Sequence, residues 1–358
     1  MSMKPNEAGT VRSASDAPTA RRGFLRTLAH RSTAAAPELP DEGRLGPLAR
    51  ATGWLNSPPL TPERLRGQVV LVDFWTYTCV NWLRTLPYLR AWDEKYRSHG
   101  LAIVGVHTPE FRFERDPANV TFECAKLGVT YPVALDAHYG VWEDYANHYW
   151  PALYLADAHG RIRYHHFGEE EYAATEMAIQ QLLIARGEEI DTDLVEVDPT
   201  GLELPANWRT LRSPETYLGF GRSDPSAPGW DRLIDRPEDF APRDSLPLNG
   251  WDLQGRWTVT SDAVRLEESD GSIRVNFHAR DVNLVMQSRT GAGVSFTLRL
   301  DGGPIDGSAG ADVRADGQGE VIRPGTYQLI RQVAAPEDCT LEIEFASPGV
   351  EAFCFTFG

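Results

Sequence analysis

The distribution of apolar and polar residues divides the chain into two regions with different secondary structure. In the first region, short apolar runs alternate with longer amphipathic segments, which predicts strands and helices in alternation. Such a chain forms a sheet covered by helices, and the turn Asp157-Ala158-His159-Gly160 predicts that its last two strands form an antiparallel hairpin. The predicted strands are residues 68–75, 101–106, 151–155 and 162–167, and the predicted helices are 79–98, 114–127, 138–148 and 170–187.

The second region begins near Trp251 and has short strands of alternating polarity with no helix between them. Residues 273–278 and 294–300 are examples, and Gly- and Asp-rich turns separate them, which predicts an all-β sandwich. Two domains also suit a chain of 358 residues, which is too long for one typical core. We therefore expect a disordered tail over residues 1–45, an α/β domain over 46–190, a Pro-, Gly- and Ser-rich connector over 191–248 and a β-sandwich over 249–358.

One cysteine lies at a junction typical of redox sites. The apolar strand is followed by Thr76-Tyr77-Thr78-Cys79-Val80-Asn81-Trp82 and then by a predicted helix. A thiol at this junction faces unpaired backbone N–H groups and the positive end of the helix, which favours the thiolate. Because the position three residues after Cys79 holds Trp82, this motif lacks the second thiol of a Cys-x-x-Cys pair.

Residues 52–187 resemble a thioredoxin-fold domain of the TlpA and DipZ type, in which Val-Asp-Phe-Trp precedes the active-site cysteine and Thr-Leu-Pro-Tyr-Leu follows it. The resemblance implies that Asp73 is the buried acid of the site and that Trp150-Pro151 provides a cis-proline. With Trp82 in place of the resolving cysteine, Asp73 is left with a structural or a general-base role. The residues expected to bind substrate are Trp75, Thr76, Trp82, Trp150 and Pro151.

The end of the chain resembles the DipZ C-terminal domain, a jelly roll similar to carbohydrate-binding modules. Residues 278–285 and 352–358 carry this resemblance, which implies a glycan or a protein as partner of the sandwich. Trp251 and Trp257 are candidate sugar-stacking residues, but aromatic residues of sandwiches more often fill the core, so we expect no sugar binding. No apolar run reaches the length of about 20 residues that a membrane helix needs, so the membrane portion of DipZ is not expected.

Three functions are compatible with this site. In the first, Cys79 attacks a disulfide or a peroxide and an external thiol resolves the product, with Glu110 as proton-transfer partner or as a merely solvated loop carboxylate. In the second, Thr76 assists Cys79 as the threonine of peroxiredoxins does, although Val72 stands where those enzymes have a proline. In the third, the protein is a non-catalytic interaction module whose groove binds an extended peptide, and Cys79 is a small buried apolar residue.

The other three cysteines predict no second redox centre. Cys124 lies in a predicted helix, where a buried structural cysteine is commoner than one that resolves Cys79. Cys339 and Cys354 flank a predicted hairpin whose alternation points Cys339 inward and Cys354 outward, so both are expected to be free thiols.

Composition and charge exclude several classes of function. A formal net charge of -16 argues against nucleic-acid binding, which depends on Lys and Arg. His165 and His166 are neighbours in a predicted strand and point to opposite faces, so we expect no metal and no cofactor. Four scattered cysteines favour a soluble cytoplasmic thiol protein. Residues 20–26 resemble a twin-arginine export signal, but the short segment that follows contains a histidine and an arginine, so export is the alternative.

Overall fold

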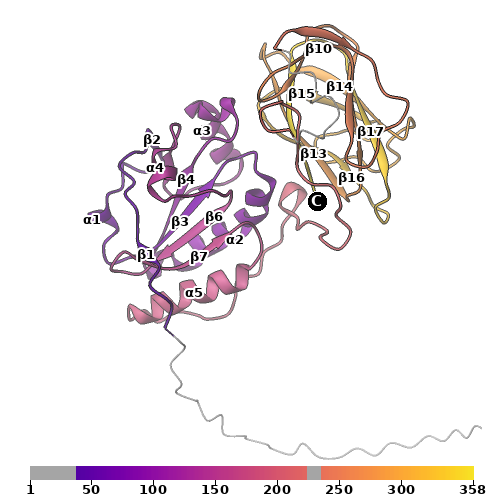
Figure 1. Cartoon of the computed structure of the whole chain (residues 1–358). Helices are drawn as coiled ribbons and strands as arrows, with labels where there is room; N and C mark the ends of the chain where they lie inside the picture. The colour runs from indigo at the N-terminus through magenta and orange to yellow at the C-terminus, as the bar shows by residue number, and fades with distance from the viewer. Residues whose placement is uncertain (1–37, 224–234) are drawn as a thin grey trace, which may run out of the picture. The chain divides into compact units, whose positions relative to one another are not determined.

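The structure, a computed structural model, describes residues 38–223 and 235–358. Its first part is a mixed sheet with helices on both faces (Figure 1). The strands are β1 Gly43–Arg44, β2 Gly53–Leu55, β3 Val69–Trp75, β4 Leu101–His107, β5 Val133–Leu135, β6 Ala152–Ala156 and β7 Arg161–Phe167. They are ordered β1-β7-β6-β3-β4-β5-β2, with β3, β4 and β5 parallel and the others antiparallel to their neighbours. This arrangement confirms the predicted thioredoxin fold.

Helices cover the sheet because β3 is apolar on both of its faces. Val69, Leu71 and Trp75 pack with α2, α3 and α5, whereas Val70, Val72 and Phe74 pack on the opposite face with Leu65 and Val141. The helices and helical turns are α1 Pro62–Leu65, α2 Val80–Tyr96, η1 Arg97–His99, η2 Arg112–Arg115, α3 Pro117–Lys126, α4 Gly140–Asp144, α5 Tyr172–Ala185 and η3 Gly201–Glu203. The predicted helix over 114–127 therefore begins later, because Asp116 caps it and Pro117 occupies its first turn.

The second part is an antiparallel sheet that curls into a two-layered sandwich, as predicted (Figure 1). Its strands are β8 Thr216–Tyr217, β9 Pro237–Phe240, β10 Trp251–Val259, β11 Val264–Leu266, β12 Gly271–Phe277, β13 Asp281–Ser288, β14 Val294–Leu300, β15 Gln318–Val321, β16 Gly325–Arg331, β17 Cys339–Phe345 and β18 Val350–Phe357. The order is β15-β14-β17-β12-β10-β11-β18-β13-β16, and β8 and β9 pair with β18 and β10. Strand β10 passes from one layer to the other at Gly255, whose φ of 95° is open to glycine and strained for other residues.

One expectation about the organisation of the chain requires correction. Residues 43–44, assigned to a disordered tail, form β1 and pair with β7, because an edge strand leaves backbone groups that need partners. The connector contributes β8 and β9 to the sheet of the sandwich, where they pair with β18 and β10. The candidate export signal over residues 20–26 lies outside the described residues.

Candidate active site

Cys79 lies where strand β3 gives way to helix α2, and it is the N-cap residue of that helix. Its Sγ is 3.8 Å from the carbonyl oxygen of Trp150, and the Trp150-Pro151 peptide bond is cis. The structure therefore brings together Cys79, Trp150 and Pro151, as the sequence predicted. The side chain is nevertheless nearly enclosed, because Cys79 is only 7% exposed.

The electrostatics at Cys79 contradict the expected thiolate. Burial raises the pKa of the Cys79 thiol well above its usual value, and the nearby carboxylates of Glu215 and Glu110 raise it further. The backbone N–H groups of Trp82 and Asn81 lower this pKa, but their effect is smaller than that of burial. In this structure the Cys79 thiol is thus protonated at neutral pH.

Asp73 contacts a tryptophan where a dithiol enzyme has its second cysteine. The Nε1–H of Trp82 donates to Oδ2 of Asp73 at 3.0 Å, and the ring of Trp82 stacks on Trp75 at 4.1 Å between centroids. Burial raises the pKa of Asp73 to about 7, although the bond from Trp82 opposes the shift. Trp75, Thr76 and Trp82 are each 0% exposed and Pro151 is also buried, so Trp150 is the one expected substrate-binding residue that is partly exposed.

Glu114, which the sequence analysis did not select, joins the two loops of the site. One carboxylate oxygen accepts from the hydroxyl of Thr78 at 2.6 Å and from its backbone N–H at 3.3 Å. The other oxygen accepts from the backbone N–H groups of Glu110 and Phe111 at 2.7 and 2.8 Å. Burial raises the pKa of Glu114 to about 7. The sequence signal was only an acidic residue at the third position of a short helical turn, where carboxylates bond to N-terminal amides.

Glu110 is held by the connector. The hydroxyl of Tyr217 lies 2.6 Å from Oε1 of Glu110, and Arg222 forms an ion pair with the same oxygen at 2.8 Å. The guanidinium of Arg222 lies over the ring of Tyr217, 3.9 Å from its centroid. Glu215 completes the cluster, with an oxygen 3.3 Å from the Tyr217 hydroxyl. Glu110 is therefore neither a solvated loop carboxylate nor free to move.

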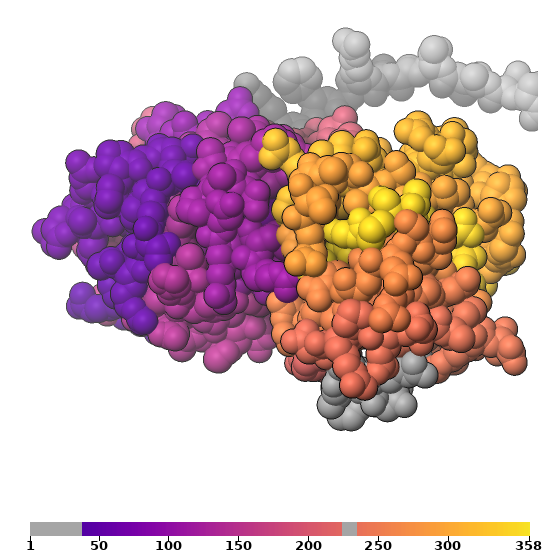
Figure 2. Space-filling view, turned by 90° about the horizontal axis from the view of Figure 1, so that it is seen from above, coloured from indigo at the N-terminus to yellow at the C-terminus, as the bar shows by residue number. Residues whose placement is uncertain are grey.

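The β-sandwich packs directly on the strand-to-helix junction. Residues 39–358 form one compact unit, and a continuous cluster of buried side chains joins Cys79 and helix α2 to Val285 and Phe353 of the sandwich. The hydroxyl of Thr326 on β16 donates to the carbonyl of Thr78 at 2.9 Å. On the face shown in Figure 2, the magenta atoms of the first part abut the orange and yellow atoms of the sandwich. The residue next to Cys79 is thus covered by a strand almost 250 positions away.

Charged side chains strengthen the same interface. Arg84 on helix α2 forms an ion pair with Glu169 at 2.7 Å and donates to the carbonyl of Phe357 at 3.1 Å. Arg112 on η2 forms an ion pair with Glu351 on β18 at 2.5 Å. Arg84 and Glu169 are both buried, so their ion pair is shielded from the solvent that weakens surface ion pairs, whereas Arg112 is 42% exposed.

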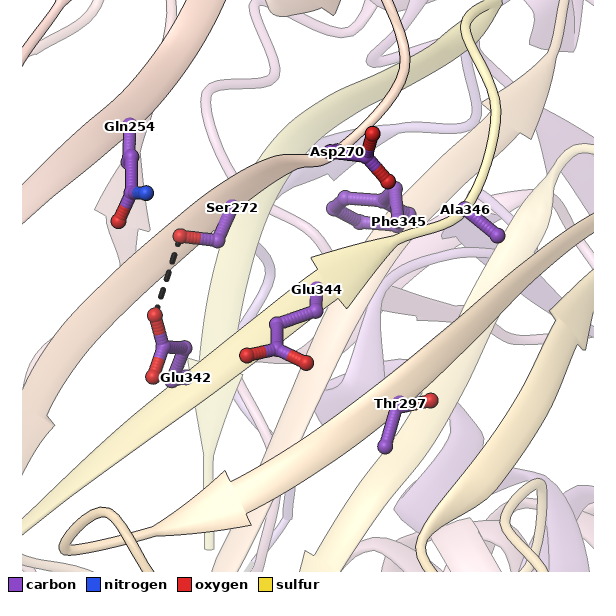
Figure 3. A pocket seen from close by; sticks show the side chains of 8 residues that line it. All are labelled: Gln254, Asp270, Ser272, Thr297, Glu342, Glu344, Phe345 and Ala346. Atoms are coloured by element: carbon purple, nitrogen blue, oxygen red, sulfur yellow. Dashed lines mark hydrogen bonds between the residues drawn. The ribbon is translucent and has the colours of Figure 1, made fainter.

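Neither of the two candidate sugar-stacking residues is exposed on the sandwich. Trp251 and Trp257 lie in its core, as expected for aromatic residues of a sandwich. A hollow of about 380 Å³ opens on one layer, and Figure 3 shows the bond in it from Ser272 to Glu342, 3.2 Å long. The one aromatic side chain lining this hollow, Phe345, is itself buried. The hollow therefore lacks an exposed ring on which a sugar could stack.

Cys339 and Cys354 follow the predicted alternation. All four cysteines are free, Cys339 lies in the core of the sandwich, and Cys354 faces the cluster around helix α2. Cys124 is buried, and burial raises its pKa to about 12. Over residues 38–223 and 235–358, no group of three or more His, Cys, Asp or Glu side chains is placed to hold a metal ion. Within the same ranges, no helix is both long and apolar enough to cross a membrane.

Comparison with known proteins identifies two matching families. Residues 55–183 match the family described as Redoxin, and residues 213–358 match the family described as thioredoxin like C-terminal domain. Protein DipZ of Mycobacterium bovis and of Mycobacterium tuberculosis is 36% identical over 327 residues, which are 90% of this chain and 44% of the relative's length. The chain thus spans less than half of these relatives.

A shorter relative covers the first part alone. Thiol-disulfide oxidoreductase YkuV of Bacillus subtilis is 28% identical over 141 residues, which are 38% of this chain and 94% of that relative. Among solved structures, the solution structure of a thioredoxin-like protein in the oxidized form shares 26% identity and covers 40% of this chain and 97% of that chain, with a TM-score of 0.37.

Proposed function

Because the chain belongs to the thioredoxin-like redoxin family and carries a DipZ-like C-terminal sandwich, we propose that it is a thiol oxidoreductase whose nucleophile is Cys79. The observation that carries this proposal is the position of Cys79. It is the N-cap of helix α2, and its Sγ lies beside the carbonyl of Trp150, next to Pro151. Among the four cysteines, no other precedes a helix at the end of a strand of the α/β sheet.

The proposed reaction begins with loss of the Cys79 proton. The thiolate is the reactive form, and the backbone N–H groups of Asn81 and Trp82 stabilise it as it forms. Glu215 and Glu110, the carboxylates that act on Cys79, are the proposed proton acceptors. The thiolate then attacks a disulfide or a peroxide, and an external thiol reductant regenerates the protein. Asp73 has a structural part in this scheme, because its carboxylate is engaged by Trp82.

Two observations favour a second candidate, a non-catalytic interaction protein. Cys79 is buried beneath the sandwich with a raised pKa, and Trp82 occupies the position of a resolving thiol. In that case the edge beside Trp150 and Pro151 binds a peptide or protein. A peroxidase of the peroxiredoxin kind is less well supported, because the side chain of Thr76 is buried and Val72 replaces the expected proline.

The substitution Cys79→Ser separates these functions. We expect the purified parent to reduce a small disulfide or hydrogen peroxide with dithiothreitol as electron source, and the variant to lose this turnover entirely. Cys124→Ser is the matched control and keeps the parental rate, because Cys124 lies in helix α3 outside the strand-to-helix junction. Equal rates in the parent and in Cys79→Ser would leave the interaction protein as the function.

A cytoplasmic location, with export as the alternative, stays a prediction.

A further inference from the structure

Cys354 lies on β18, on the side of that strand that faces away from the core of the sandwich. Ala352 and Phe355 belong to the core of the sandwich, whereas Phe353 and Cys354 belong to the buried cluster that contains Cys79. Two successive residues leave the core because the register between β13 and β18 shifts at Val285. The shift therefore presents a thiol of the sandwich to the cluster around the proposed nucleophile.

The pairing of four strands fixes where this thiol lies along the interface. Val285 on β13 pairs with Thr326 on one side and with Cys354 on the other, and Cys354 in turn pairs with Tyr217 on β8. Neighbouring strands lie about 4.8 Å apart, so these four residues form a continuous row across the sheet.

Both ends of this row are bound to the loops of the candidate active site. Thr326 donates to the carbonyl of Thr78, the residue before Cys79, and the hydroxyl of Tyr217 contacts Glu110. Cys354 is in the row between these two contacts. It is therefore held against the part of the molecule in which Cys79 lies.

The charges around the two thiols agree with this placement. After burial, the largest influences that raise the pKa of Cys354 are Glu215 and Glu110, in the same order as for Cys79. Both thiols therefore lie within electrostatic range of the same two carboxylates. Cys124 differs, because the nearby carboxylate that raises its pKa is Glu123 of its own helix.

We propose that Cys354 is the resolving thiol for Cys79, so that the redox pair is divided between the start of helix α2 and the last strand of the sandwich. This inference rests on the proposed function of Cys79 as nucleophile. It provides from β18 the second thiol that Trp82 excludes from helix α2. The C-terminal sandwich then becomes part of the reaction rather than an attached binding module.

The oxidation of Cys79 and Cys354 by a small disulfide needs no further co-reactant. With a small disulfide, Cys79 forms a bond to one sulfur and the other sulfur leaves as a thiolate, which takes up the proton lost by Cys79. Cys354 then loses its proton and attacks Sγ of Cys79, and the second substrate thiolate leaves and takes up that proton. Two electrons and two protons pass to the substrate, and the protein keeps a Cys79–Cys354 disulfide. An external dithiol returns it to the reduced form.

Peptide mapping under non-reducing conditions tests this pairing. The full chain is treated with oxidised glutathione, or in parallel with hydrogen peroxide, and is quenched with acid and alkylated before digestion. We expect the parent to give one linked peptide pair that contains Cys79 and Cys354. We expect Cys354→Ser to accumulate about one glutathione per chain on Cys79, because nothing resolves the mixed disulfide. Cys124→Ser, the matched control, gives the same linked pair as the parent.

Each other outcome has a definite meaning. A parent that retains glutathione on Cys79 without a linked pair, or a pair that disappears in Cys124→Ser, overturns the role of Cys354 and leaves Cys79 as the nucleophile. A Cys79 that reacts with neither oxidant overturns the proposed function itself. Serine can replace the Cys354 thiol as donor to the carbonyl of Phe355, 3.3 Å from Sγ in this structure. Should that variant still misfold, the linked pair in the parent alone decides the question.

Discussion

Single residues near Cys79 show how one replacement redirects the chemistry of its neighbours. Trp82 adds a large ring where a dithiol enzyme has a small thiol, and the ring is accommodated by stacking on Trp75 and donating to Asp73. Asp73 is thereby confined to an environment from which water is excluded, where its charged form is disfavoured. Burial of Asp73 therefore makes the stability of the core depend on pH.

Asp73→Asn tests this interpretation through stability. The pKa of Asp73 rises from about 3.9 in the unfolded chain to about 7 in the folded chain, so its ionisation destabilises the fold as pH rises from about 4 to about 7. Asparagine keeps the acceptor for Trp82 and removes the ionisation. We expect the variant to be more stable than the parent at pH 8, by at most about 4 kcal/mol at about 1.4 kcal/mol per pKa unit, and equal to it near pH 4.

Urea unfolding at both pH values measures the difference. Asp239→Asn is the control, because that carboxylate is 79% exposed and its variant should follow the parent at both pH values. An Asp73→Asn variant that is less stable than the parent by the same amount at pH 4 and pH 8 would show that folding does not raise the pKa of Asp73.

Among the elements, those built from local pattern were predictable and the docking of the sandwich was not. Strand β3 and helix α2 follow from an apolar run and from the amphipathic segment after it, and Cys79 at their junction follows with them. The contact of Thr326 with Thr78 joins residues 248 positions apart, and the local sequence around neither residue predicts it. The helical end that should favour a thiolate was therefore recognised from sequence, whereas the burial that outweighs it was not.

Thr326→Val tests whether β16 closes the junction. Valine has nearly the same shape but cannot donate to the carbonyl of Thr78, so the net loss is about 1 kcal/mol and the population with an open interface rises about fivefold. We expect the alkylation rate of Cys79, followed by peptide mapping at neutral pH, to rise by the same factor. Thr297→Val on β14, whose side chain lines the hollow of Figure 3, is the matched control. Unchanged labelling of Cys79 in Thr326→Val would mean that this bond does not limit access.

Across the whole described chain, the α/β part and the sandwich depend on one another through groups that neither could bury alone. Arg84 is 3% exposed, and its guanidinium pairs with Glu169 of the α/β part through Nη1 and donates to the carbonyl of Phe357 through Nη2, while its buried Nε has no hydrogen-bond partner among the described residues. Buried cations persist only where such partners surround them. Separation of the sandwich would hydrate Arg84 and expose the cluster around Cys79 together, so stability and thiol access should be coupled.

Arg84→Met removes two interactions that can be tested separately, the ion pair within the α/β part and the hydrogen bond to the sandwich. Alone, it leaves Glu169 buried without its cation, and we expect a loss of about 3 to 5 kcal/mol in unfolding free energy and faster alkylation of Cys79. Arg299→Met is the control, because that side chain is 47% exposed and its partner Glu344 is 45% exposed, so their ion pair contributes at most about 1 kcal/mol.

The double variant Arg84→Met with Glu169→Gln removes the unpaired charge and should recover much of the stability. It cannot restore the bond to Phe357 on β18, so the sandwich remains less firmly held and Cys79 should still be alkylated faster than in the parent. If stability and slow alkylation both return to parental values, Arg84 acts only within the α/β part. Faster alkylation at recovered stability would instead show that the sandwich controls access to Cys79 independently of the stability of the fold.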